Sequence, residues 1–155
     1  MNRILYMCLK NIPRIPAAWI KLCKYAKNPD KYSRQEMADH IRYIMTLAVK
    51  SGNINLKVTG TELFPAEDGF MLYGNHQGMF DAVALLAAID RPVSAVFKKE
   101  LKDIPFVKQI VAITASYAMD REDVRQSMEV ILNTAKSVSE QKRNFIIFPE
   151  GTRSK

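Results

Sequence analysis

The chain has 155 residues, of which 48% are hydrophobic and 25% charged, a length and composition that suit one folded domain and exclude a disordered chain, a collagen or a coiled coil. Lys and Arg outnumber Asp and Glu by 23 to 16, and six of the seven net positive charges lie in residues 1–27, which contain no acid. A nucleic-acid-binding domain would be basic on its folded face, so we expect a basic arm on a nearly neutral body and no nucleic-acid partner.

The basic arm, residues 1–30, contains two amphipathic segments. In the first, the apolar residues fall within an arc of about 140° on a helical wheel; they are Ile4, Leu5, Cys8, Leu9 and Ile12. In the second, the apolar side is formed by Trp19, Leu22, Cys23 and Ala26. Either the arm lies in a membrane interface, with Trp19 and Tyr25 at the lipid–water boundary, or it packs as a helical hairpin on its own domain. The two cysteines, Cys8 and Cys23, have no partners at metal-ligand spacing, so no metal site is predicted.

Strands and helices are expected to alternate after the arm, in a domain over residues 31–155. A capping box, Ser33 to Glu36, opens the first helix, beside whose apolar stripe His40 is expected at the surface or edge. The expected strands are Asn55–Val58, Phe70–Tyr73, Val93–Phe97, Ser116–Met119 and Phe145–Phe148. The further expected helices are Phe80–Ile89, Pro105 to about Val111, and Asp123–Ser139. This alternation predicts an α/β fold with a mostly parallel sheet flanked by helices.

His76 lies where a buried strand is expected to end and a helix to begin, which is where open α/β sheets place their sites. Asp81 follows five residues later, in the first turn of the expected helix, and we expect its carboxylate to reach back to the histidine ring. Such a contact fixes the ring tautomer and raises the basicity of the other nitrogen. On its own the pair is equally compatible with Asp81 complementing the helix dipole.

Two further polar segments follow expected strands. Arg121 comes after the strand that ends at Met119, and Glu150, Gly151, Thr152 and Arg153 come after the strand that ends at Phe148. The backbone amides at Gly151, together with Thr152 and Arg153, could cradle an anion, and Arg121 could hold a phosphate. Taken alone, the first segment is also compatible with an ordinary polar loop, and Arg121 with a surface ion pair. A histidine base without a serine or cysteine nucleophile favours activation of a substrate hydroxyl, and the arginines favour a substrate that carries a phosphate.

These segments resemble sequence blocks of the glycerolipid acyltransferase family, typified by the 1-acylglycerol-3-phosphate acyltransferases. The first block, Asn-His-x4-Asp, matches Asn75, His76 and Asp81, and the third, Phe-Pro-Glu-Gly-Thr-Arg-Ser, matches Phe148 to Ser154 in full. The second block, Gly-x-x-Phe-x-x-Arg, matches at Arg121, while Ala115 and Ala118 stand where Gly and Phe are usual. The fourth block, an apolar Pro-containing segment, would lie after Lys155, so the domain is expected to be C-terminally truncated.

The resemblance implies direct acyl transfer without a cofactor. His76, oriented by Asp81, would deprotonate the free hydroxyl of lysophosphatidic acid, which attacks the thioester of acyl-CoA or acyl-carrier protein. Arg121 and Arg153 would hold the acceptor phosphate, Glu150, Gly151 and Thr152 would shape that loop, and Asn75 would be a positioning residue. The expected location is peripheral or monotopic, on the cytoplasmic face of a membrane, with the arm of residues 1–30 as the membrane-docking segment and residues 31–155 as the catalytic domain. The alternatives are another acceptor, such as glycerol 3-phosphate, or a lipid-binding module without catalytic competence.

Overall fold

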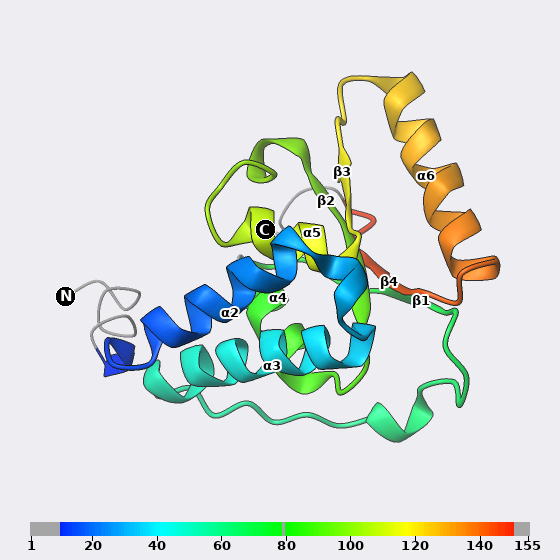
Figure 1. Cartoon of the computed structure of the whole chain (residues 1–155). Helices are drawn as coiled ribbons and strands as arrows, with labels where there is room; N and C mark the ends of the chain where they lie inside the picture. Colours follow the sequence, from blue (N-terminus) through cyan, green and yellow to red (C-terminus); the bar gives the residue numbers. More distant parts are fainter. Residues whose placement is uncertain (1–9, 79, 151–155) are drawn as a thin grey trace.

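A computed structural model describes residues 10–78 and 80–150 of the chain. Four parallel strands form its sheet, in the order β1-β4-β2-β3 (Figure 1). These strands are β1 (Met71–Tyr73), β2 (Val93–Lys98), β3 (Tyr117–Met119) and β4 (Asn144–Ile147). The first three residues of β4 are buried, because the strand is central and both faces of the sheet are covered. The predicted α/β fold is therefore confirmed.

Five helices longer than one turn accompany the sheet in the described residues. They are α2 (Ile15–Lys27), α3 (Arg34–Ser51), α4 (Phe80–Ala88), α5 (Val107–Thr114) and α6 (Val124–Ser139). Three short 3-10 helices, η1 (Pro29–Lys31), η2 (Thr61–Leu63) and η3 (Lys99–Leu101), lie in the connections. The cap predicted at Ser33 is confirmed, because its side chain accepts from the Glu36 amide at the start of α3. Asp123 caps α6 in the same way, with its side chain accepting from the Gln126 amide.

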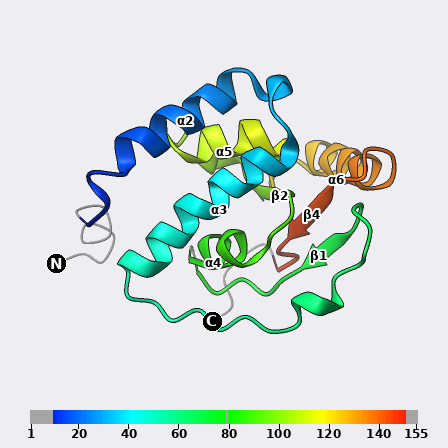
Figure 2. The same cartoon turned by 60° about the horizontal axis from the view of Figure 1, so that its bottom comes forward.

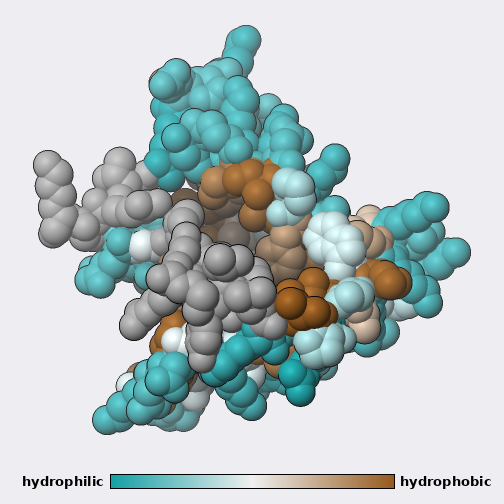
Figure 3. Space-filling model, turned by 90° about the vertical axis from the view of Figure 1, so that its left-hand side faces the viewer, coloured by the Kyte–Doolittle hydropathy of each residue, from teal (hydrophilic) through white to brown (hydrophobic). Residues whose placement is uncertain are grey.

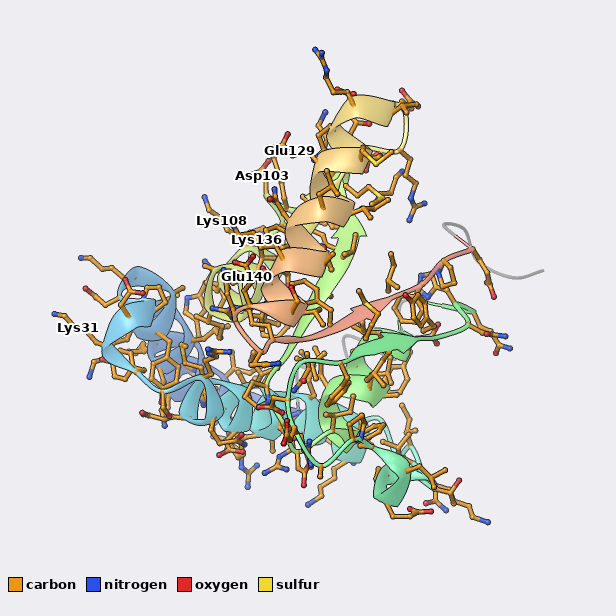
Figure 4. The ribbon with its side chains drawn as sticks, turned by 90° about the vertical axis from the view of Figure 1, so that its right-hand side faces the viewer. Lys31, Asp103, Lys108, Glu129, Lys136 and Glu140 are labelled. Carbon is orange, nitrogen blue, oxygen red and sulfur yellow. The ribbon has the colours of Figure 1, made fainter. Side chains whose placement is uncertain are left out.

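The two faces of the sheet are covered by different helices (Figures 1 and 2). Ile146 and Val93 point toward α4 and form a core with Ile89. Side chains alternate along a strand, so Phe145 points the other way, where its ring stacks on Tyr117 and the Tyr117 hydroxyl meets Ser137 of α6. Figure 4 shows Glu129, Lys136 and Glu140 along one side of α6, which stands out from the body on this second face.

A separate apolar cluster joins α2, α3 and α5. Its buried members are Leu22, Tyr25, Met37, Ile41, Met45 and Ile113. Leu22 and Tyr25 are almost fully enclosed, and the Tyr25 hydroxyl donates to the Glu36 carboxylate at 2.7 Å. The expectation that Tyr25 lies at a lipid–water boundary is therefore wrong, because this side of α2 packs on its own domain.

Three apolar side chains of α2 are nevertheless exposed. Ile15, Trp19 and Ile20 remain accessible, with Ile20 at 67% exposure. The structure thus shows α2 packed on its own domain through Leu22 and Tyr25, with part of its apolar surface uncovered in the described residues. The first amphipathic segment, from Ile4 to Leu9, lies outside the described residues.

Two further expectations are corrected. Residues 55–58 form no strand, although they were predicted to; side-chain exposure partly alternates along them, but no described strand lies beside them to complete a ladder. His40, expected at the surface or edge, is only 7% exposed because α2 covers it, and its Nε2 lies 3.0 Å from the Ala18 carbonyl oxygen.

Candidate active site

The predicted contact between His76 and Asp81 is present. β1 ends at Tyr73 and α4 begins at Phe80, so His76 lies in the turn between them and Asp81 in the first turn of the helix. The Nδ1 atom of His76 lies 2.8 Å from Oδ2 of Asp81, and about a quarter of each side chain is exposed. The pair is therefore both fixed in geometry and accessible to a substrate.

The Asp81 carboxylate is held by the turn itself. Its Oδ2 also accepts from the amides of Gln77, at 2.7 Å, and Gly78, at 3.0 Å. Partial burial tends to raise the pKa of Asp81, but the amides of Gly78 and Gln77 and the His76 ring outweigh it, so the pKa lies below its usual value. An ionised carboxylate accepts hydrogen bonds and donates none, so Nδ1 of His76 carries the proton and the lone pair lies on Nε2.

The third sequence block meets the first because β1 and β4 are neighbours. The rings of His76 and Phe148 stack with their centroids 4.6 Å apart, and Oε2 of Glu150 accepts from the His76 amide at 3.4 Å. A Cβ at Gly74 would meet the Phe148 ring at 3.1 Å, closer than ordinary van der Waals contact, so glycine lets the ring approach without a shift. Phe148 was not among the predicted site residues; its place next to Pro149 in a strand-end motif was the signal for it.

The remaining predicted site residues are Asn75, Arg121, Gly151, Thr152 and Arg153. Asn75 lies beside His76 in the turn and is exposed. Gly151, Thr152 and Arg153 lie outside the described residues. Arg121 is exposed after β3, which two strands separate from β1, so the structure does not place it next to His76.

The turn that carries Arg121 is well anchored. Asp120 pairs with Lys99, Nζ to Oδ2 at 2.7 Å, and its amide donates to Oε1 of Gln126. The Lys99 ammonium, followed by the Glu122 amide, holds the pKa of Asp120 below its usual value. In residues 10–78 and 80–150, no group of three acidic, His or Cys side chains is placed to hold a metal ion.

Comparison with known proteins agrees with this geometry. A family model described as "Acyltransferase" matches residues 55–155, which is more than half of the chain and includes every residue of the site. The chain belongs to the acyltransferase family. No solved structure matches it significantly.

Curated relatives carry a common name. The chain is similar to 1-acyl-sn-glycerol-3-phosphate acyltransferases of Saccharomyces cerevisiae (30% identity), Helicobacter pylori (37%) and Borreliella burgdorferi (26%). These alignments cover 65%, 52% and 74% of this chain, respectively. They cover 33%, 34% and 46% of the relatives, so the chain matches a third to a half of their length. Acyltransferase chemistry in phospholipid biosynthesis is the function that these names support.

Proposed function

We propose that this protein transfers a fatty acyl group from a thioester to the free hydroxyl of lysophosphatidic acid, giving phosphatidic acid. The observation that carries the proposal is the His76–Asp81 pair at the end of β1, with Nδ1 held by an ionised carboxylate. This arrangement leaves the basic lone pair on Nε2, the atom required to take a proton from a hydroxyl. The names of the relatives support this acceptor.

The proposed reaction balances without a protein nucleophile. Nε2 of His76 takes the proton of the acceptor hydroxyl, whose oxygen forms a bond to the thioester carbonyl carbon. The C–S bond then breaks, and the proton passes from His76 to the departing thiolate of coenzyme A or acyl-carrier protein. Asp81 stabilises the imidazolium that exists between these proton transfers. Arg121 and Arg153 are proposed to bind the acceptor phosphate, with Asn75, Glu150, Gly151 and Thr152 shaping the site around it.

The acceptor is a lipid, so we also propose that the protein works on the cytoplasmic face of a membrane. The exposed apolar side chains of α2 support this, because Ile15, Trp19 and Ile20 lie on a helix that also carries Lys21 and Lys24. Figure 3 shows apolar side chains gathered in the middle of the face that looks left in Figure 1. None of the described helices is long and apolar enough to cross a membrane, and the proposed attachment does not require one.

Acylation of lysophosphatidic acid by the purified protein tests the function. His76→Ala is expected to lower the rate by about 10² to 10⁴, because the general base is lost. The matched control is His40→Gln, which removes the other histidine and should retain the rate at a temperature where both variants are folded. Undiminished activity in His76→Ala would overturn the mechanism, and vesicle binding without any turnover would favour the lipid-binding alternative.

Trp19, the single tryptophan of the chain, tests the membrane attachment directly. Its fluorescence should shift to the blue when anionic vesicles are added, because the exposed ring enters a less polar interface. Ile20→Glu is expected to weaken the effect, and raised salt should weaken it as well. An unchanged spectrum at saturating vesicle concentration would contradict attachment through the exposed apolar side chains of α2.

A further inference from the structure

A cavity lies at the other end of the sheet from His76. Its volume is about 330 Å³, and its lining includes Val93 and Asn144, the first residues of β2 and β4. Because all strands are parallel, their amino ends lie on the edge opposite the candidate active site. The buried side chains of Met37, Ile41 and Ile113 form apolar parts of its wall.

The charged side chains of the wall are mostly basic. The basic ones are Arg34, Arg91, Lys142 and Arg143, against the single carboxylate of Asp68. Asp68 is engaged: its Oδ1 accepts from Asn144 at 2.9 Å and lies 3.7 Å from Arg91. The charges of Arg34, Lys142 and Arg143 are therefore left uncompensated by the wall.

Arg34 and Arg143 converge on one residue, Gln141. Arg34 donates to its carbonyl oxygen at 3.1 Å, and Nε of Arg143 donates to its side-chain oxygen at 3.1 Å. Both partners are neutral, and no carboxylate of the described residues lies within 4 Å of either guanidinium. Burial, followed by the charge of Arg34, lowers the pKa of Arg143. Two like charges held together beside a partly apolar cavity are stabilised by an anion between them.

We propose that this cavity binds a small, soluble phosphorylated molecule through the guanidinium groups of Arg34 and Arg143. A guanidinium presents paired N–H groups that match two phosphate oxygens, and the two guanidinium groups offer two such pairs. The volume lies at the lower end of the range for small-molecule sites, which suits a compact ligand and not a lipid with long chains. The apolar wall then contacts the carbon part of the ligand.

Titration with inorganic phosphate and with glycerol 3-phosphate, at constant ionic strength, tests the site. A ligand that binds the folded protein raises its Tm in a saturable way. Arg34→Gln and Arg143→Met should each weaken this effect at least about ten-fold, since each removes one charged phosphate contact. The amide NMR signals of residues 142–144 should shift, and those of residues 76–78 should not.

Arg125→Gln is the matched control, because it changes an exposed arginine of α6 and should leave binding as in the unmodified protein. Arg121→Gln changes the arginine proposed to hold the acceptor phosphate, so it reports binding at the candidate active site. Absence of saturable binding would overturn the proposal, as would binding that is unchanged in Arg34→Gln and Arg143→Met. Loss confined to Arg121→Gln would place the phosphate at the candidate active site instead.

Two further measurements separate a loss of folding, and binding to a lipid headgroup, from binding of a soluble ligand. If Arg143→Met does not fold, Arg34→Gln, whose side chain is exposed, decides the outcome, and Arg143→Lys tests whether charge alone suffices. Binding to phosphatidic acid vesicles that requires Arg34 and Arg143, without binding of glycerol 3-phosphate, would replace the soluble ligand with a lipid headgroup and overturn the proposal as stated.

Discussion

The two histidines of the chain lie in contrasting regions, one at the end of a strand and one inside a helical layer. His76 is 25% exposed and its Nδ1 meets the Asp81 carboxylate. His40 lies on α3 beneath α2, its ring stacks on Tyr43 and packs edge-on against Tyr25, and its Nε2 meets the neutral carbonyl of Ala18. The residue type is the same in both regions, and both rings contact an aromatic neighbour, so the difference lies in the hydrogen-bond partner and in access.

This difference decides what each ring is able to do. A carboxylate stabilises the imidazolium, so His76 is suited to accept a proton during a reaction. Burial lowers the pKa of His40, and the Ala18 carbonyl only partly opposes this, so His40 is suited to remain neutral. We therefore expect changes around His76 to alter the rate, and changes in the helical layer to alter stability.

After the loss of His76 itself, the largest expected effect is that of Asp81→Asn. The neutral side chain of Asn no longer stabilises the imidazolium as the carboxylate does. Its NH2 group can also occupy the position from which the Asp81 oxygen accepts the hydrogen bond of the ring. We expect the acylation rate to fall by about 10², with a Tm close to that of the unmodified protein. The measurement is kcat/KM for lysophosphatidic acid, alongside thermal unfolding.

Asp39→Asn is the matched control for this change. Asp39 is also a carboxylate next to a histidine in sequence, but it lies on the exposed side of α3 and pairs with Arg42. Its loss should leave the rate unchanged. Equal losses of activity in the two variants would mean that the contact with His76 is not what gives Asp81 its effect.

A smaller effect is expected from pH acting on His40. The folded-state pKa is lowered relative to the ordinary value of 6.5, so the unfolded chain binds more protons than the folded one as the pH falls through that value. Stability contributed by neutral His40 is therefore present above about pH 6.5 and is lost on acidification toward the lower, folded-state pKa.

His40→Gln measures this contribution. Gln donates to the Ala18 carbonyl without titrating, so the Tm of this variant should fall less between pH 7 and pH 5 than that of the unmodified protein. His76→Gln leaves His40 in place, so the Tm of this variant should fall between pH 7 and pH 5 as much as that of the unmodified protein. Identical pH profiles for His40→Gln and the unmodified protein would show that His40 titrates freely, and would remove the contrast between the two regions.

The sequence predicted the region around His76 more closely than the region around His40. The turn between β1 and α4 is local, so a spacing of five residues sufficed to place Asp81 against the ring. The neighbouring position of β1 and β4 brought Phe148 into the site, which only the strand order reveals. His40 was misplaced because its burial depends on how α2 crosses α3, and a helical wheel of one helix carries no information about the other.

Dependence on contacts with other elements also explains why the strand predicted at residues 55–58 is wrong, and why Tyr25 does not lie at the predicted lipid–water boundary. Alternation predicts a strand only where a neighbouring strand completes the ladder. An aromatic residue on an amphipathic helix fits a core as well as an interface, and the Glu36 carboxylate opposite the Tyr25 hydroxyl decides in favour of the core. Capping residues such as Ser33 were predictable because their bonds are made within one turn.

The smallest expected effect concerns Ala115, which ends α5 in the helical layer. Its φ of 51° and ψ of 44° are left-handed, a conformation that costs a non-glycine residue about 1–2 kcal/mol. This is the position where the family resemblance led us to expect Gly, and the structure supplies a physical reason for that preference. Ala115→Gly relieves the strain but adds about 0.4–1 kcal/mol of entropy to the unfolded chain.

The net result should be a gain of about 0.5–1 kcal/mol, or a rise in Tm of about 1–4 °C, without a change in rate. Ala118→Gly is the matched control, because Ala118 lies within β3, where glycine is destabilising by about 0.5–1 kcal/mol. The two substitutions exchange the same side chain for hydrogen and should act in opposite directions. A fall in Tm for both would show that Ala115 is held in place by packing that outweighs its backbone strain. A change in rate for Ala115→Gly would mean that the helical layer and the strand ends are coupled.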